Sequence, residues 1–201
     1  PLKRLGCDIM TDSDPRQSKE RMHRRYRTKG KKVTHFLSPS PYYTEKIASA
    51  FDVDPSQDGL FINSGYPRND ALLEPSEEKT AEFKKSLGIP EGAKVILYTP
   101  TWRDNEYQNG HGFQYESPVN LGKLMELLPE NYILLFRAHH QVGTSEVIQE
   151  TDRIFDVTDA DDLNDLYLIS DLMITDYSST MFDYSVLKRP MVFHMYDLER
   201  Y

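Results

Sequence analysis

The sequence has one cysteine, no initiator methionine and no apolar run that approaches a membrane span. Cys7 alone cannot form an internal disulfide, and it excludes a metal site built on several cysteines. A spanning helix needs about 20 consecutive apolar residues. No apolar stretch of the kind found in a signal peptide follows Pro1-Leu2-Lys3-Arg4. We therefore expect a cytoplasmic protein, and we expect this chain to be an internal fragment of a longer one.

Several well-defined catalytic and cofactor motifs are also missing. There is no Gly-x-x-x-x-Gly-Lys-Ser/Thr loop and no Gly-x-Gly-x-x-Gly, which removes the main signal for a P-loop ATPase or a Rossmann dehydrogenase. A Gly-x-Ser-x-Gly elbow is absent too, which counts against an α/β-hydrolase. The acids show no metal-binding pattern, since Asp12-Ser13-Asp14 stands in an unpatterned loop. We predict no metal site and no cofactor.

Charge is spread unevenly along the chain. The formal net charge is -8, yet the segment from Arg16 to Lys32 holds nine lysines and arginines and one acid, so that it carries +8 and the remainder -16. A solvated surface explains such a segment, and the alternative is binding of a polyanion or an anionic membrane surface. Nucleic acid is a poor partner, because the acidic remainder would repel it.

The 201 residues, of which 38% are hydrophobic and 28% charged, fit one large globular domain or two small ones. Short apolar runs alternate with amphipathic stretches, which predicts an α/β fold. We expect strands at residues 33–37, 60–62, 94–98, 132–136, 154–157, 172–174 and 191–194. Helices are expected at 18–27, 44–51, 72–85 and 121–128, and a breaker at Leu87-Gly88-Ile89-Pro90-Glu91-Gly92 marks a domain boundary. The polar stretch from residue 105 to 118 reads as a surface loop of functional length.

Polar residues follow the carboxyl ends of the predicted strands. In open parallel sheets, ligands bind outside those ends. The residues expected on this rim are Thr101, Arg103, Asp104, Arg137, His139, Thr158, Ser178 and Ser179. Arginine supplies fixed, bidentate positive charge, and histidine donates to a phosphoryl oxygen or moves a proton near neutral pH. The rim therefore predicts a phosphate or pyrophosphate site, although Arg103 and Asp104 would also fit a simple ion pair.

The stretch from Asp165 to Tyr184 carries the most specific local pattern. A short apolar run is followed by Thr175-Asp176-Tyr177-Ser178-Ser179-Thr180 and then by a helix. Unpaired N–H groups in a first helical turn attract anions, and the hydroxyls of Ser178, Ser179 and Thr180 would add donors. An ordinary helix cap accounts for the same residue types, so both interpretations stay open at this point.

At these residues the chain resembles the CDP-glycerol glycerophosphotransferases, the teichoic acid primases and polymerases. The matching stretches occur in the family's order and cover nearly the whole chain. They are Pro1-Leu2-Lys3-Arg4-Leu5-Gly6, Ser38-Pro39-Ser40, Gly65-Tyr66-Pro67-Arg68-Asn69-Asp70, Tyr98-Thr99-Pro100-Thr101-Trp102-Arg103-Asp104, Arg137-Ala138-His139 and Ser170-Asp171 through Asp183-Tyr184.

The resemblance implies a GT-B-type fold of two Rossmann-like domains with the active site between them. Residues 1–73 would be the end of the N-terminal, acceptor-side domain. Residues 74–90 would form a linker region, and 91–201 most of the C-terminal, donor-nucleotide-binding domain. In the family, Pro1-Leu2-Lys3 is preceded by His-Gly-Thr, whose histidine is the proposed general base, so we expect this fragment alone to be inactive.

The resemblance also implies a reaction and roles for residues. An acceptor hydroxyl attacks the β-phosphorus of CDP-glycerol, or of a similar CDP-polyol, and CMP leaves. His139 matches the catalytic histidine that contacts the donor phosphates. The substrate-binding residues would be Thr101, Arg103, Asp104, Arg137, Thr158, Ser178, Ser179 and Thr180. The acceptor would be a polyanionic or lipid-linked teichoic acid or capsular polymer, met at the inner face of the cell membrane.

Two other functions fit part of the pattern. A nucleotide-sugar glycosyltransferase or epimerase of GT-B fold would share the rim, but it would normally need an acidic pair for ribose and sugar hydroxyls. A non-catalytic polymer-binding module is supported only by the basic segment from Arg16 to Lys32.

Overall fold

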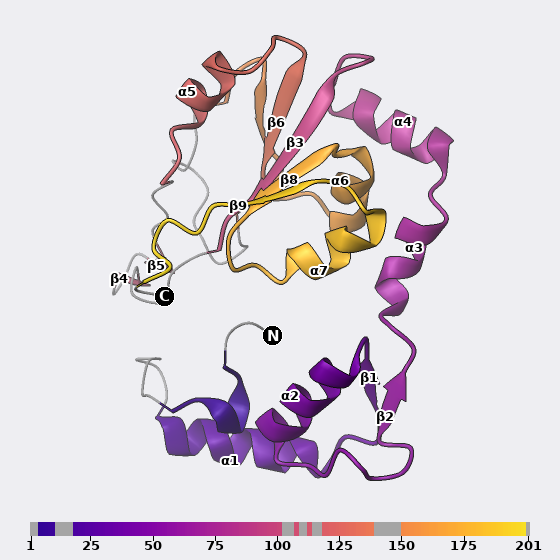
Figure 1. Ribbon diagram of the computed structural model, residues 1–201, viewed down its shortest axis with the longest axis vertical. Coiled ribbons are helices and arrows are strands. Elements are labelled where there is room, and N and C mark those ends of the chain that lie inside the picture. Colours follow the sequence, from indigo (N-terminus) through magenta and orange to yellow (C-terminus); the bar gives the residue numbers. More distant parts are fainter. Residues whose placement is uncertain are drawn as a thin grey trace. The chain divides into compact units, whose positions relative to one another are not determined.

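The computed structural model describes residues 4–10, 18–101, 107–108, 112–113, 118–138 and 150–199 (Figure 1). The chain divides into two compact units, Pro1–Asp70 and Ala71–Tyr201. Both units are built from parallel strands and helices. The α/β class expected from the sequence is therefore present in each of them.

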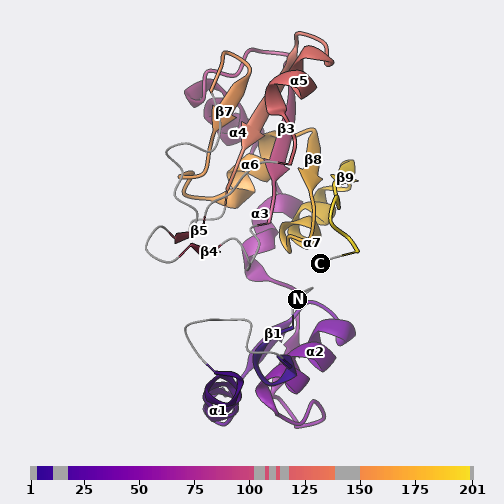
Figure 2. The ribbon, with the colours of Figure 1, turned by 90° about the vertical axis from the view of Figure 1, so that its left-hand side faces the viewer.

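The first unit contains a two-stranded parallel sheet and two helices that contact each other (Figure 2). Its elements are η1 (Gly6–Asp8), α1 (Lys19–Gly30), β1 (Phe36–Ser38), α2 (Pro41–Phe51), β2 (Phe61–Asn63) and η2 (Pro67–Asn69). Both helices begin at a serine whose hydroxyl accepts a backbone N–H, Ser18 from Arg21 and Ser40 from Tyr43. The ring of Phe51 lies 4.9 Å from Tyr26 and 5.1 Å from Phe36, so aromatic contacts join α1, α2 and β1.

The second unit contains a five-stranded, fully parallel sheet (Figure 1). Its strands are β3 (Lys94–Thr99), β6 (Tyr132–Phe136), β7 (Ile154–Asp156), β8 (Leu172–Thr175) and β9 (Met191–Phe193). In space they run β7-β6-β3-β8-β9. Numbered along the chain, that is 3-2-1-4-5, the strand order of the doubly wound nucleotide-binding folds. A separate antiparallel pair joins β4 (Tyr107–Gln108) to β5 (Gly112–Phe113) within the segment expected to be a loop.

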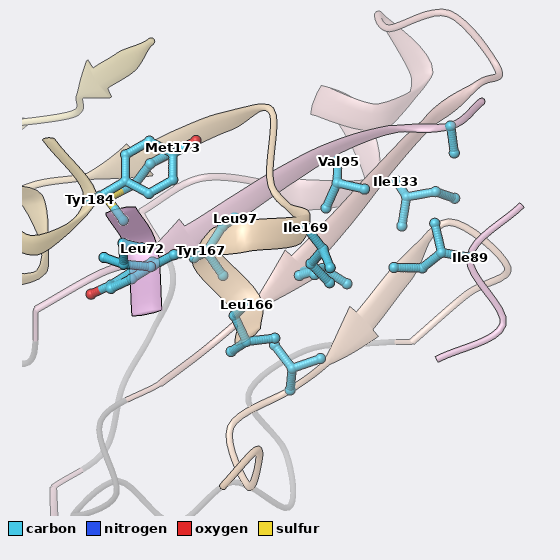
Figure 3. Packing of buried hydrophobic residues seen from close by; sticks show 13 residues of the cluster. Leu72, Ile89, Val95, Leu97, Ile133, Leu166, Tyr167, Ile169, Met173 and Tyr184 are labelled. Carbon is cyan, nitrogen blue, oxygen red and sulfur yellow. The ribbon is translucent and has the colours of Figure 1, made fainter. Parts of the chain in front are cut away.

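Helices cover both faces of this sheet because its central strands are apolar on both sides. The helical elements of the unit are α3 (Asp70–Leu73), α4 (Glu77–Ser86), α5 (Leu121–Glu126), α6 (Leu163–Ile169), α7 (Thr180–Tyr184) and η4 (Ser185–Leu187). Val95 and Leu97 of β3 face a core formed with α4, α6 and α7 (Figure 3). Tyr98 faces the opposite core, which α5 closes. Such burial on both faces is typical of parallel sheets.

Most of the expected elements are found at or near the expected bounds. The strand 132–136 is found unchanged as β6, while the predicted helix 72–85 is divided by Pro75 into α3 and α4, with Ser76 capping α4. Residues 74–90, assigned from the sequence to a linker region, thus include a helix. Phe83 and Leu87 from this region pack against the core of the second unit, and the contact-based division falls earlier, after Asp70.

Candidate functional site

The carboxyl ends of β3 and β8 lie side by side at the centre of the second unit's sheet. Thr99 of β3 pairs with Thr175 of β8, and the Thr175 hydroxyl donates to the Thr99 carbonyl oxygen at 2.8 Å. From β3 the chain goes on to strands on one side of the sheet, and from β8 to β9 on the other. This is the topological switch point, where doubly wound folds bind their ligands. The expected rim residues Thr101 and Ser178–Thr180 follow these two strands.

Asp176 joins the two strand ends. Its Oδ1 accepts hydrogen bonds from the Thr101 backbone N–H at 2.9 Å and from the Thr101 hydroxyl at 2.5 Å. The backbone N–H of Tyr177 donates to the same oxygen at 2.7 Å. The carboxylate is buried, with 4% of Asp176 exposed. In this arrangement the Thr101 hydroxyl donates its proton to Asp176, so it does not offer that proton to a phosphate.

The hydroxyl turn after β8 is organised around Thr180. Its hydroxyl donates to Ser178 Oγ at 3.0 Å and also lies 3.3 Å from the Thr99 hydroxyl. The Thr180 N–H donates to Ser178 Oγ at 3.4 Å. Ser178 accepts in both of its bonds, which leaves its own hydroxyl proton to be donated elsewhere. Ser178 is half-buried and Ser179 exposed, so both side chains are accessible from solvent.

Helix α7, which begins at Thr180, has five residues. Its N-cap residue Ser179 makes no capping hydrogen bond through its side chain. A helix of this length aligns few peptide dipoles, so the electrostatic attraction expected at its N-terminus is weak. The chemistry of the turn therefore rests on hydroxyl and backbone donors rather than on a helix dipole.

Arg137 and Thr158 lie beside each other at the ends of β6 and β7. The backbone N–H of Ala138 donates to Thr158 Oγ1 at 3.0 Å, and Thr158 is buried. Arg137 Nη1 donates to the carbonyl oxygens of Val157 at 3.3 Å and Ala160 at 2.8 Å. These contacts anchor the chain that leaves β7. Arg137 and Thr158 therefore have a structural role at the rim, in addition to the substrate-binding role expected from the sequence.

Three predicted site residues, Arg103, Asp104 and His139, lie outside the described residues. Of the candidates, the structure brings together Thr101, Ser178 and Thr180 at the switch point, and Arg137 and Thr158 on the neighbouring strands. Within the described part of the chain no group of three or more His, Cys, Asp or Glu side chains could hold a metal ion.

Sequence reasoning missed Asp176 as a member of this site. The residue stands inside the hydroxyl-rich turn, but an aspartate there is equally typical of an exposed turn. The informative signal is its position directly after a buried strand, since Thr175 is fully buried and Asp176 nearly so. A buried carboxylate requires hydrogen-bond donors, and these come from Thr101, 75 residues earlier in the chain.

Comparisons with known proteins agree with the motifs. A family model described as CDP-Glycerol:Poly(glycerophosphate) glycerophosphotransferase matches residues 1–201. The teichoic acid glycerol-phosphate transferase of Staphylococcus aureus is 38% identical over 203 residues, covering 100% of this chain and 51% of the relative. A variant of the wall teichoic acid polymerase TagF matches with a TM-score of 0.87 and 36% identity, covering 100% of this chain and 49% of that one. A structure of a TagF variant soaked with CDPG matches with a TM-score of 0.86 and 35% identity, covering 99% of this chain and 48% of that one.

The chain spans 51% of the length of this Staphylococcus aureus relative and 27% of the length of a teichoic acid poly(glycerol phosphate) polymerase of Bacillus subtilis. The likeness to TagF confirms the α/β, GT-B-type fold expected from the sequence. The match of the family model to all 201 residues likewise confirms the resemblance first seen in the motifs. This chain belongs to the CDP-glycerol:poly(glycerophosphate) glycerophosphotransferase family.

Proposed function

We propose that this chain contains the donor-binding part of a transferase that moves glycerol phosphate from CDP-glycerol to a teichoic acid or related polymer, with release of CMP. The observation that carries the proposal is the family match over the whole chain. Two of the matched proteins support this choice of donor and acceptor. The Staphylococcus aureus relative is a teichoic acid glycerol-phosphate transferase, and one TagF variant was soaked with CDPG.

The geometry of the second unit supports a donor site at the switch point. Ser178 and Ser179 offer hydroxyl protons beside the ends of β3 and β8. Hydroxyl donors suit the oxygens of a pyrophosphate, and they stabilise the charge that grows on the CMP phosphate as it leaves. Arg103, Arg137 and His139 would supply positive charge, and His139 would donate to or protonate the leaving phosphate.

Calorimetric titration of the chain with CDP-glycerol tests the donor. We expect a saturable signal with CDP-glycerol, and none of similar strength with UDP-glucose or UDP-N-acetylglucosamine. Tighter binding of a UDP-sugar would instead favour a nucleotide-sugar glycosyltransferase or epimerase. Release of CMP from CDP-glycerol, measured in a full-length enzyme of the family with and without a poly(glycerol phosphate) acceptor, tests the transfer step.

A second proposal concerns the basic helix α1. Most lysines and arginines in the described part of the basic segment from Arg16 to Lys32 are exposed: Arg21, Arg24, Arg25, Arg27, Lys29, Lys31 and Lys32. Tyr26 turns inward onto Phe51, and Arg27 pairs with Asp52 at 3.0 Å. Within the described ranges, every helix is too short or too polar to cross a bilayer. We propose that α1 holds the protein on an anionic, cytoplasmic membrane surface, near the polymer acceptor.

Charge substitution separates this role from donor binding. Replacing Arg21, Arg24 and Arg25 with Ser removes three positive charges, each contributing roughly 1 kcal/mol at an anionic surface, so binding to phosphatidylglycerol vesicles should fall about a hundredfold. The control replaces Lys79, Lys85 and Lys123 with Ser, which changes net charge equally on exposed positions of the second unit. Equal losses in both variants would contradict the proposal. Loss of CDP-glycerol binding in the arginine variant would place α1 at the donor site instead.

A further inference from the structure

We propose that Asp176 is a positioning residue for the donor: through Thr101 it holds the end of β3 against the turn that carries Ser178, Ser179 and Thr180. The inference rests on the proposed function, since the site it organises is the proposed donor site. Asp176 itself is assigned no contact with the donor.

The bonds to Asp176 come from both sides of the switch point. Thr101 follows β3 and contributes two donors, its N–H and its hydroxyl, while Tyr177 follows β8 and contributes one N–H. All three donate to Oδ1. Hydrogen bonds to an ionised acceptor are about twice as strong as neutral ones. One carboxylate oxygen therefore ties together two loops that are 75 residues apart in sequence.

The burial and charge of Asp176 argue against a direct role as a ligand. Only 4% of the residue is exposed. A carboxylate placed against a pyrophosphate would also repel it, because like charges at close range are unfavourable. The negative charge is instead satisfied by the donors of Thr101 and Tyr177, and the hydroxyls of Ser178 and Ser179 remain the groups that face a ligand.

The three bonds to Asp176 form a tether beside the proposed donor contacts. Ser178 and Ser179 come two and three positions after Asp176. The contact between the hydroxyls of Thr99 and Thr180 adds a second link across the same two strand ends. A small displacement of a positioned group costs up to about a hundredfold in rate. Loosening the tether should therefore weaken donor binding in addition to lowering stability.

The sheet supplies a matched control in Asp171. This residue precedes β8, and its Oδ2 accepts the Val95 N–H at 2.9 Å, so it also bridges β3 and β8, but at their amino ends. Asp171→Asn and Asp176→Asn each replace one interstrand carboxylate by an isosteric amide. The measurements are the dissociation constant of CDP-glycerol by calorimetry and the thermal unfolding temperature of each variant.

We expect Asp176→Asn to weaken CDP-glycerol binding by about tenfold or more, and Asp171→Asn to leave it within about twofold, at comparable losses of thermal stability. Equal effects on binding in the two variants would show that Asp176 is merely structural. If the wild-type chain binds no CDP-glycerol, the proposed function fails and this inference fails with it. If the wild type binds and Asp176→Asn binds equally well, only this inference fails.

Substitution of Thr101 keeps the inference testable if Asp176→Asn does not fold. Thr101→Ser retains the hydroxyl that donates to Asp176, whereas Thr101→Val removes it at nearly constant volume. Binding of CDP-glycerol should be retained in Thr101→Ser and weakened about tenfold in Thr101→Val. Indistinguishable binding by these two variants would overturn the role assigned to the tether.

Discussion

Asp171 and Val95 join the amino ends of the two central strands of the second unit. The Val95 N–H donates to Asp171 Oδ2 at 2.9 Å, and Lys94 Nζ lies 3.1 Å from Oδ1. Partial burial raises the pKa of the Asp171 carboxyl, but the bonds from Val95 and Lys94 favour its charged form more strongly. The pKa of Asp171 consequently lies below its ordinary value.

Because of this lowered pKa, Asp171 should stabilise the fold at neutral pH and lose this effect in acid. A carboxyl whose pKa is lower in the folded than in the unfolded state stabilises the fold above the unfolded value, about 3.9, and loses this effect as the pH falls through the folded value. Asp171→Asn should be less stable than the wild type at pH 7, and the two should converge as the pH falls below about 4. Thermal unfolding at pH 7 and pH 3 checks this, and a constant difference would contradict it.

The buried phenol of Tyr184 should make the stability of the fold depend on pH in the alkaline range. Burial raises the pKa of this phenol to about 12, against the opposing charge of Arg189, and its hydroxyl donates to the Ser170 carbonyl at 3.1 Å. Because the unfolded phenol ionises near pH 10, stability present below that value is lost between about pH 10 and pH 12.

Tyr184→Phe should remove part of this alkaline loss and cost about 0.5–1.5 kcal/mol at pH 7 through the missing hydrogen bond. Urea unfolding at pH 7 and near pH 11 measures both effects. Tyr42→Phe, at an exposed site, is the control and should change neither. An alkaline loss that is identical in Tyr184→Phe and the wild type would refute the prediction.

Truncation of Leu97 measures how much packing in the core of the second unit contributes to the free energy of unfolding. The side chain of Leu97 is fully buried in the central strand β3, within the cluster closed by α4, α6 and α7. Leu97→Ala should lower the free energy of unfolding by about 2–5 kcal/mol, because a cavity remains after truncation. Leu127→Ala, at a residue that is 84% exposed, should stay within about 0.5 kcal/mol of the wild type. Similar urea midpoints for both variants would be incompatible with this core.

Gly6 lies where the backbone of the first unit leaves no room for a side chain. It has a φ of 55°, and a Cβ there would lie 2.3 Å from the Ala50 carbonyl oxygen. Gly59 has a φ of 71° with no atom within 4 Å of such a Cβ, so Gly59→Ala measures the cost of the backbone conformation alone, about 1–2 kcal/mol. Gly6→Ala should cost clearly more, because a backbone atom must move. Proteolysis or thermal unfolding of the two variants tests this, and equal costs would contradict it.

His139 carries the prediction about catalysis. If it donates to the donor phosphates, His139→Ala in a full-length enzyme of the family should lower the rate of CMP release from CDP-glycerol about 10²–10⁴-fold. His35→Ala, at an exposed position of the first unit, should leave the rate unchanged. A normal rate in His139→Ala would mean that His139 has a structural role only.

Much of the architecture was predictable because it depends on local patterns. The apolar run of β6 and the helix that begins after Ser18 follow from neighbouring residues, whereas the continuous helix predicted for 72–85 was wrong because Pro75 divides it into α3 and α4. The candidate rim followed from the same patterns, since polar residues that end parallel strands share one edge of the sheet. What could not be derived this way was the partner of each strand.

The sequence by itself determined the α/β class, the family and the residue types at the strand ends. Only the tertiary structure decided that β3 lies between β6 and β8, because strand order depends on contacts between residues far apart in the chain. That order puts the switch point between Thr99 and Thr175. It also brings Thr101 onto the carboxylate of Asp176, which needs those donors because it is almost completely buried.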